Sequence, residues 1–365
     1  MSSHLRTRNR RLHSGAVITG ILCFAQSFYQ QGLNAQSEKP SRIESNQELI
    51  RFELSVPAMG SHLDMVVYAP TEHQAKAIIE VGLAEIDRLS PVLSNYDSMS
   101  EIMTLCSAPS GDWTPISNDL AAVLSQSRRW YKLSDGKFDI TVGPLTQLWR
   151  TSRKRMQLPS LADVADAKLR CGWKFVELDP DSSNGLDDCP LRVSLLKPKM
   201  MLDLSGLAVG YIVDAAFAKM FSTGARHILL NAGGDIRVGD APPGSDGWKI
   251  KIAGLDKESP PLAMLRLQNC AVTTSGDLNQ FVEIDGRRYG HFIDPDTGDP
   301  IERRQSVTAI AATTLDADAG ATAMAVLGMI RSSELFESLP LHEAIFVVAG
   351  QSDTEPIRMQ WIKKK

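Results

Sequence analysis

Hydrophobic and polar residues alternate with different periods along the chain, and the changes of period divide it into strands and helices. Residues 52–68 alternate with a period of two and are rich in β-branched side chains, which predicts a pair of strands turning near Gly60. Thr71 is a good N-cap for a helix, because apolar residues then recur at helical spacing up to about residue 89. We expect Pro91 to end this helix.

Further segments follow the same two patterns. Helices are predicted from near Ser117 to Gly136, over residues 161–169 and over residues 318–329. Strands are predicted at 173–178, 193–196, 201–204, 228–231, 236–238, 248–253, 263–267, 280–284, 307–313 and 344–348. Helices and strands mix without strict alternation, so we predict an α+β fold with largely antiparallel sheets and packed helices rather than a doubly wound sheet.

The composition is that of a globular protein with a sizeable core. The chain has 365 residues, of which 43% are hydrophobic and 22% charged. Without residues 1–35, which carry four positive charges, the net charge changes from −4 to about −8. An acidic chain is a poor candidate for nucleic-acid binding, which requires clustered Lys and Arg. The one dense basic run before the C-terminus, residues 150–155, is interpreted as a solvated loop.

The N-terminus has the features of an export signal. A basic stretch with four arginines precedes an apolar stretch at residues 16–28, and Ala35 offers a cleavage site before Gln36. We therefore expect residues 1–35 to be a signal peptide and the protein to be exported, either periplasmic or membrane-associated. An uncleaved anchor or a basic tail is the alternative. Residues 36–50 are predicted to be a disordered linker and residues 51–365 the functional domain.

The cysteines exclude two common site types. No CxxC pattern occurs, so neither a zinc knuckle nor a thioredoxin-like redox site is indicated. Cys171 and Cys189 could close a surface loop in an oxidising compartment, or both could remain free thiols.

Residues 273–300 are the most informative stretch of the chain. They are expected to form a strand-rich hairpin region that ends in Asp-Pro and Thr-Gly turns. Ser275, His291 and Asp294 would then lie on or beside turns, where a ligand can reach them. An imidazole titrates near neutral pH, so His291 is a candidate proton acceptor. The neighbouring Asp294 could either orient His291 or help to hold the loop.

Seven segments together resemble the FAD:protein FMN transferase family, the ApbE-type flavin transferases. In chain order they are Met59-Gly60-Ser61, Ser94-Asn95-Tyr96, GKFDITVGPL at 136–145, DLSGLAVGYIVD at 203–214, Gly233-Gly234-Asp235, residues 274–300, and Asp318 with Thr322. They span about residues 55–330. The resemblance implies an ApbE-like fold and Mg²⁺-dependent transfer of FMN from FAD to a threonine hydroxyl of a target redox protein, with AMP released. It also allows association with membrane complexes.

The resemblance further implies a metal site and a nucleotide site. Asp318, Thr322 and the backbone carbonyl of Gly206 match the positions that bind the metal. Asp318 and Thr322 are four residues apart on a predicted helix and share a face. Such a sparse set suits Mg²⁺, which keeps several waters and binds substrate phosphate oxygens. The predicted contacts of the flavin nucleotide are Met59, Tyr96, Lys137, Phe138, Asp139, Asp203, Ser275 and Ile293.

Three points qualify this assignment. Gly233-Gly234-Asp235 can be explained as a β-turn between strands, so we leave it out of the catalytic set. Val209 stands where the family usually has a basic or polar residue, so one substrate contact is absent or supplied elsewhere. Cys106 stands where relatives often carry Asn. Two other functions use the same residues, an FAD pyrophosphatase that gives FMN and AMP, and a flavin-binding protein without turnover.

Overall fold

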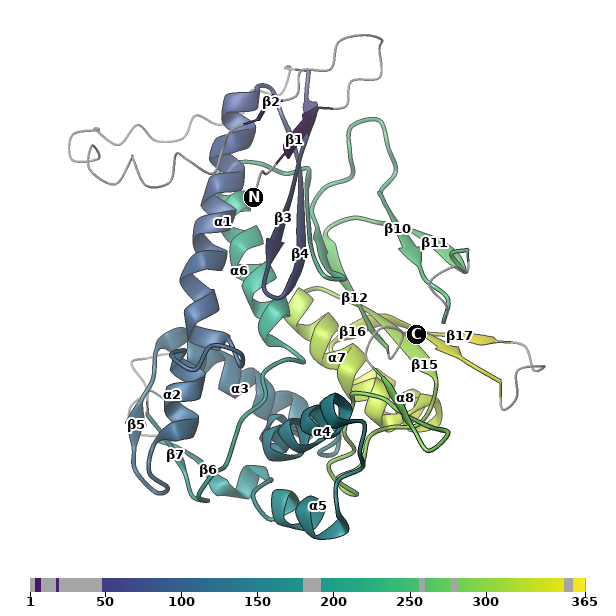
Figure 1. The fold of residues 1–365 in the computed structure, drawn as a ribbon. Helices are drawn as coiled ribbons and strands as arrows, with labels where there is room; N and C mark the ends of the chain where they lie inside the picture. Colours follow the sequence, from purple (N-terminus) through teal and green to yellow (C-terminus); the bar gives the residue numbers. More distant parts are fainter. Residues whose placement is uncertain are drawn as a thin grey trace.

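The structure is a computed structural model that describes residues 4–7, 18–19, 48–179, 192–255, 260–276, 281–350 and 357–364. Within these residues, ten strands form one sheet in which every neighbouring pair is antiparallel (Figure 1). From one edge to the other they are β17 (Arg358–Lys363), β16 (Leu341–Val348), β15 (Gln305–Ala311), β12 (Cys270–Gly276), β9 (Asp235–Val238), β8 (Ile228–Ala232), β4 (Ser61–Ala69), β3 (Ile50–Ala58), β1 (His4–Thr7) and β2 (Ile18–Thr19).

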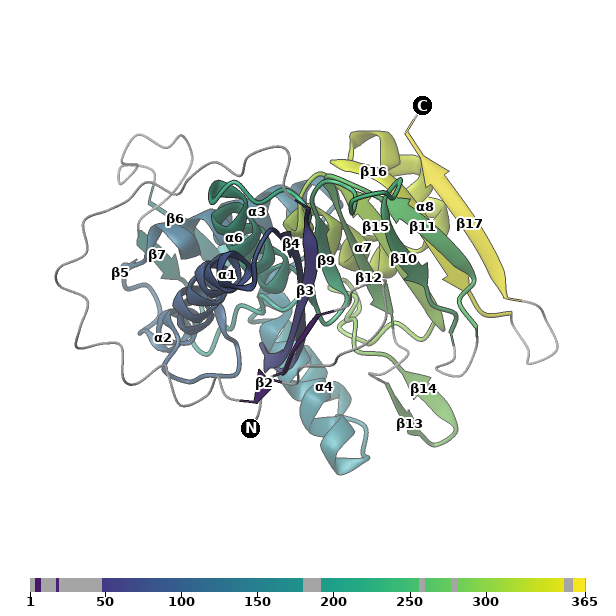
Figure 2. The same cartoon turned by 90° about the horizontal axis from the view of Figure 1, so that it is seen from above.

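Helices cover one face of this sheet and a hairpin covers the other. The helices are α1 (Glu72–Leu93), α6 (Ala208–Ser222) and α7 (Thr314–Leu327), which pack on β4, β8 and the β12–β15 pair respectively. The hairpin of β10 (Trp248–Ile252) and β11 (Ala263–Leu267) packs on the opposite face, where Trp248 joins a second apolar cluster with Val272. Seen from above, the sheet lies between these two layers (Figure 2).

The remaining elements form a mostly helical region below α1 and α7 (Figure 1). The α-helices of this region and of the chain after α7 are α2 (Glu101–Ser107), α3 (Asn118–Leu133), α4 (Gly143–Arg155), α5 (Leu161–Lys168) and α8 (Met329–Leu335). The 3-10 helices are η1 (Ile140–Val142), η2 (Trp173–Phe175) and η4 (Phe336–Ser338). The short strands are β5 (Thr114–Pro115), β6 (Val176–Leu178), β7 (Arg192–Leu195), β13 (Val282–Ile284) and β14 (Arg287–Tyr289).

The predicted α+β fold with largely antiparallel pairing is confirmed. The β3–β4 hairpin turns through Met59 and Gly60, which both have positive φ (49° and 73°), as a two-residue turn with the right-handed twist of its strands requires. The side chain of Thr71 accepts a hydrogen bond from Gln74 N and caps α1, as predicted. Ser117 and Ser160 cap α3 and α5 in the same way.

Several local predictions were wrong. Pro91 does not end α1, because the buried side chains of Leu89 and Leu93 hold the last turn against the core. Residues 201–204 form no strand. Residues 150–155 are the end of helix α4 rather than a loop, since Leu145 and Trp149 bury the opposite side of that helix.

Two boundaries also differ from expectation. The helix predicted at 318–329 begins at Thr314, so Asp318 lies in its second turn and not at its N-terminus. The predicted linker 36–50 lies mostly outside the described residues, and Ile50 already begins β3. Strands β1 and β2 belong to the predicted signal peptide, so the sheet of a processed chain would begin at β3. Cys189 lies outside the described residues, whereas Cys171 is a free thiol, as the second alternative expected for it.

Candidate active site

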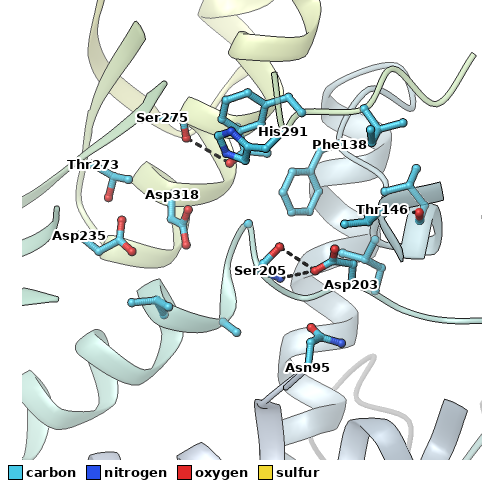
Figure 3. A pocket seen from close by; sticks show the side chains of 18 of the residues that line it. Asn95, Phe138, Thr146, Asp203, Ser205, Asp235, Thr273, Ser275, His291 and Asp318 are labelled. Atoms are coloured by element: carbon cyan, nitrogen blue, oxygen red, sulfur yellow. Dashed lines mark hydrogen bonds between the residues drawn. The ribbon is translucent and has the colours of Figure 1, made fainter. Parts of the chain in front are cut away.

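A cavity of about 570 Å³ lies where the helical region meets α6, α7 and the end of β12 (Figure 3). Such a volume is typical of small-molecule sites. All the predicted site residues except Asp294 line it: Met59, Tyr96, Lys137, Phe138, Asp139, Asp203, Gly206, Ser275, His291, Ile293, Asp318 and Thr322. The structure therefore brings together motifs from six separate parts of the chain.

The three predicted metal ligands lie close to one another. Asp318 is 5% exposed, and its Oδ2 atom has no hydrogen-bond partner in the described part of the chain. Thr322 lies one turn further along α7, and its Oγ1 is 3.2 Å from Ser275 Oγ. A Cβ atom on Gly206 would stand 3.3 Å from Thr322 Oγ1, so the backbone of Gly206 passes directly beside that hydroxyl. A buried carboxylate oxygen without a partner, beside a hydroxyl and a backbone turn, fits a hard cation that also binds substrate oxygens.

Asp235 is a site residue that the sequence reasoning missed. Its two preceding glycines, with φ of 66° and 113°, do form the expected turn between β8 and β9. The turn, however, directs the Asp235 carboxylate toward Asp318 in the cavity (Figure 3). Burial, and then the charge of Asp235, raise the pKa of Asp318 well above its ordinary value, and burial likewise raises the pKa of Asp235. The presence of GGD among the family motifs was the signal that could have identified it.

No cluster of three or more His, Cys, Asp and Glu side chains suited to a metal occurs in the described ranges. Mg²⁺ often binds only one or two carboxylates together with water and substrate phosphate oxygens, so the small set of Asp318, Thr322 and Gly206 is compatible with this ion.

His291 lies in a bend between β14 and the Asp-Pro turn. Its ring lies 3.8 Å from that of Phe292, centroid to centroid, and both residues line the cavity. The loop that follows is fixed at two points, since Lys137 Nζ donates to Asp294 Oδ1 at 2.6 Å and Trp149 Nε1 donates to the Gly298 carbonyl at 2.9 Å. These contacts favour the second predicted role of Asp294, holding the loop, while its orienting of His291 stays a prediction.

Asp203 was expected at the end of a strand. Its segment instead bonds the side chain of Asn95, which occupies the place of a neighbouring strand. Asn95 Nδ2 donates to the Leu202 carbonyl at 2.7 Å, and Asn95 Oδ1 accepts from Leu204 N at 2.7 Å. These are the two bonds that a neighbouring strand would make. The Asp203 carboxylate accepts bonds from the backbone N–H and the hydroxyl of Ser205, which forms a tight turn before Gly206.

The predicted flavin contacts provide an apolar wall and an exposed ring. Phe138 is buried against Trp130, with the ring centroids 6.5 Å apart. Tyr96 is 80% exposed at the rim, so it is not the half-buried core residue that it could have been. Asp139 accepts a hydrogen bond from Thr141 N at 2.8 Å, and burial raises its pKa to about 6.

Two arginines of the basic run 150–155 also line the cavity. This was not expected, because the run had been interpreted as a solvated loop. Arg150 and Arg153 lie one turn apart on α4. The guanidinium carbon of Arg150 lies 5.1 Å from the centre of the Tyr96 ring, and its Nη2 lies 3.4 Å from Asp203 Oδ2. Amphipathic spacing with Leu145 and Trp149 was the signal for this helix, which the high charge of residues 150–155 obscured.

Fold and cavity together define a candidate site for a small-molecule ligand, with the aspartates, a histidine and two arginines on its wall. The sequence profile described as the ApbE family matches residues 59–346. The chain is 30% identical over 274 residues to the FAD:protein FMN transferase of Escherichia coli, which covers 74% of this chain and 76% of that protein. It is 29% identical to the enzyme of the same name from Salmonella typhimurium, over 91% of this chain and 92% of that protein.

Solved structures agree with these relatives. The apo form of the Pseudomonas stutzeri flavinyl transferase ApbE superposes with a TM-score of 0.73 at 27% sequence identity, covering 86% of this chain and 95% of that one. An ApbE protein from Thermotoga maritima gives the same TM-score at 27% identity, covering 84% and 96%. The chain belongs to the ApbE family. Both the predicted family and the predicted enzyme class, a flavin transferase, are confirmed.

Proposed function

We propose that this protein transfers FMN from FAD to a threonine hydroxyl of a partner redox protein, with Mg²⁺ as the cation and AMP as the leaving group. The observation that carries the proposal is the convergence of Asp318, Thr322 and Gly206 beside His291 in one cavity. The relatives named FAD:protein FMN transferase support FAD as the donor and a protein as the acceptor.

The chemistry is an attack on the FMN phosphorus of FAD. A bond forms between the threonine oxygen and this phosphorus, the bond from phosphorus to the bridging oxygen breaks, and its electron pair leaves with AMP. A bound Mg²⁺ would neutralise charge on the phosphate oxygens. Asp318, Thr322 and the carbonyl of Gly206 would hold that cation.

His291 would accept the hydroxyl proton of the threonine. Its bend, and the anchoring of the following loop by Lys137 and Trp149, keep the imidazole at the cavity wall. Phe138 and Ile293 are buried beside it and would restrict water around the reacting phosphorus. Exclusion of water favours transfer to a hydroxyl over hydrolysis, because water is the competing nucleophile.

The test is the fate of FMN. With FAD, Mg²⁺ and a threonine-bearing acceptor, intact-protein mass spectrometry should find the acceptor heavier by one FMN, with an equal amount of AMP released. His291→Ala should slow transfer about 10²–10⁴-fold while FAD binding changes little. Release of FMN and AMP without a labelled acceptor would indicate a pyrophosphatase. Bound but unconsumed FAD with several candidate acceptors would indicate a binding protein.

The cellular setting belongs to the same proposal. The order of the basic stretch, apolar stretch and Ala35 supports export of the protein and removal of residues 1–35. A periplasmic or membrane-associated enzyme would meet exported redox proteins and membrane complexes. Among the described residues, no helix is long and apolar enough to cross a bilayer. N-terminal sequencing of protein from its native host should begin at or near Gln36, and an intact Met1 would contradict this.

A further inference from the structure

Arg150 and Arg153 form a cationic pair on one side of the cavity, and their chemistry has no part in the metal or base sites described above. They project from the same face of α4, one turn apart. Lys154 and Arg155, which follow directly on the same helix, are exposed and do not line the cavity. The helix therefore separates its basic residues into two that face the ligand space and two that face solvent.

The charge of this pair is poorly balanced by the protein. Arg153 forms no ion pair with any carboxylate in the described residues, and burial, followed by the nearby charge of Arg150, lowers its pKa. Arg150 approaches Asp203 only at 3.4 Å, and Asp203 is already engaged by Ser205. Lys137, another cation of the cavity, differs, because it is held by two aspartates at 2.6 and 2.7 Å. A partly buried guanidinium without a carboxylate is stabilised by binding an anion.

The position of the pair relative to the cation site defines which anion fits. Arg150 contacts Asp203, and three residues further along the chain Gly206 lies against Thr322. Three residues span at most about 10 Å. The arginines and the proposed metal ligands thus lie near the two ends of one short loop, close enough for a single diphosphate to reach both.

Val209, at the start of α6, lines the cavity with an apolar side chain. We propose that Arg150 and Arg153 bind the diphosphate of the dinucleotide substrate and supply from α4 the cationic contact that Val209 cannot make. This inference rests on the proposed function only in taking FAD as the ligand. Tyr96, stacked on Arg150, holds that guanidinium in place.

Arg153→Gln is the cleaner variant, because Arg150→Gln also removes a contact of Asp203. We expect Arg153→Gln to weaken binding of FAD and of ADP about tenfold, and the double variant to weaken it further. Arg155→Gln, the matched control on the same helix, should leave both dissociation constants within twofold. The loss should shrink at high salt, since screening weakens the wild-type contact. Riboflavin, which has no phosphate, should bind all these proteins alike.

A second variant tests whether the position of the charge matters. Adding Val209→Lys to Arg153→Gln returns a cation to the same cavity and should recover most of the lost ADP affinity. Unchanged ADP and FAD affinity in the double arginine variant, with its thermal unfolding unaltered, would overturn the proposal. So would an effect confined to the Michaelis constant of the acceptor protein, because the arginines would then recognise the partner. These dissociation constants are measured without turnover. The test of the arginines therefore remains valid even if the protein does not transfer FMN.

Discussion

The carboxylates of Asp235 and Asp318 face each other in the cavity, one from a hairpin turn and the other from the second turn of α7 (Figure 3). Asp318 is buried and Asp235 is half-buried, and the charge of Asp235 opposes ionisation of Asp318. Two facing carboxylates with few other partners are stable only when a proton or a cation lies between or beside them. The pair would therefore link the stability of this region to the proposed cation.

Asp318→Ala should reduce Mg²⁺-dependent turnover at least about 100-fold, since it removes the one charged ligand of the predicted set. Thr322→Val should raise the Mg²⁺ concentration for half-maximal rate but spare the maximal rate more, because a neutral hydroxyl is the weaker ligand. Turnover measured across a Mg²⁺ series, with thermal unfolding as a check of the fold, tests both. Wild-type activity in Asp318→Ala at every Mg²⁺ concentration would mean that the cation is held elsewhere.

The variant Asp235→Asn tests whether Asp235 acts on the proposed cation, since this residue faces Asp318 but is not one of the three predicted ligands. Loss of the charge that faces Asp318 should stabilise the cation-free protein and weaken Mg²⁺ binding, because less negative charge would surround the ion. Thermal unfolding with and without Mg²⁺ measures both effects. A variant that Mg²⁺ stabilises as much as the wild type would show that Asp235 does not act on the cation.

Asp214 fixes the start of the helix that carries the proposed cation ligands. Its two carboxylate oxygens accept hydrogen bonds from Thr314 N at 2.8 Å and Leu315 N at 2.9 Å, and so cap α7 from a neighbouring helix. Asp214→Ala should cost about 2 kcal/mol, lower the melting temperature by roughly 3 °C, and raise the Mg²⁺ requirement. Asp214→Asn should not rescue it, since its amide NH₂ would face a backbone N–H. A lower melting temperature with an unchanged Mg²⁺ requirement would show that the start of α7 does not govern the ligands.

Features set by neighbouring residues were predictable from the sequence, whereas features set by distant contacts were not. Thr71, Ser117 and Ser160 cap their helices because capping needs only the next three residues. Pro91 was misjudged because burial of Leu93 outweighs the local cost of proline. Asp235 was missed because its two glycines fully explain a turn, while the residue it faces comes from another part of the chain.

The same distinction explains one of the two errors around the cavity, whereas the other had a local signal in the sequence. The segment 201–204 has the apolar pattern of a strand, but two of its backbone hydrogen bonds go to the Asn95 side chain and a third goes to the Ile140 carbonyl. The pattern of apolar and polar residues cannot show that a distant side chain, and not a neighbouring strand, will bond a segment of backbone. In α4 the Gly143-Pro144 pair is a helix start that could have been recognised, since Pro is favoured in the first turn.

Asn95 should therefore be a positioning residue for Asp203. Asn95→Ala removes both bonds to the 202–204 segment and leaves a backbone N–H and a carbonyl unpaired, which should cost about 2 kcal/mol or more. Asn95→Asp keeps the acceptor but sets an anionic oxygen against the Leu202 carbonyl, so it should be no better. Chemical unfolding and FAD titration together measure these effects. FAD affinity equal to wild type in a destabilised Asn95→Ala protein would limit the role of Asn95 to folding.

Asp139 should make stability depend on pH. Burial raises its pKa from the ordinary value of 3.8 to about 6, so the folded protein binds this proton more tightly than the unfolded chain. The associated stability is fully present below about pH 4 and is lost as the pH rises through 6, a change of about 3 kcal/mol at most.

The variant Asp139→Asn tests this pH dependence. It has no carboxyl to titrate, and its amide oxygen can still accept the hydrogen bond from Thr141 N. The unfolding free energy of the variant minus that of the wild type should therefore increase from pH 4 to pH 7, and urea unfolding at several pH values measures it. Other carboxyls titrate in both proteins and cancel in this difference. A difference that stays constant over this range, or that decreases, would mean that burial does not raise the pKa of Asp139 in the folded protein.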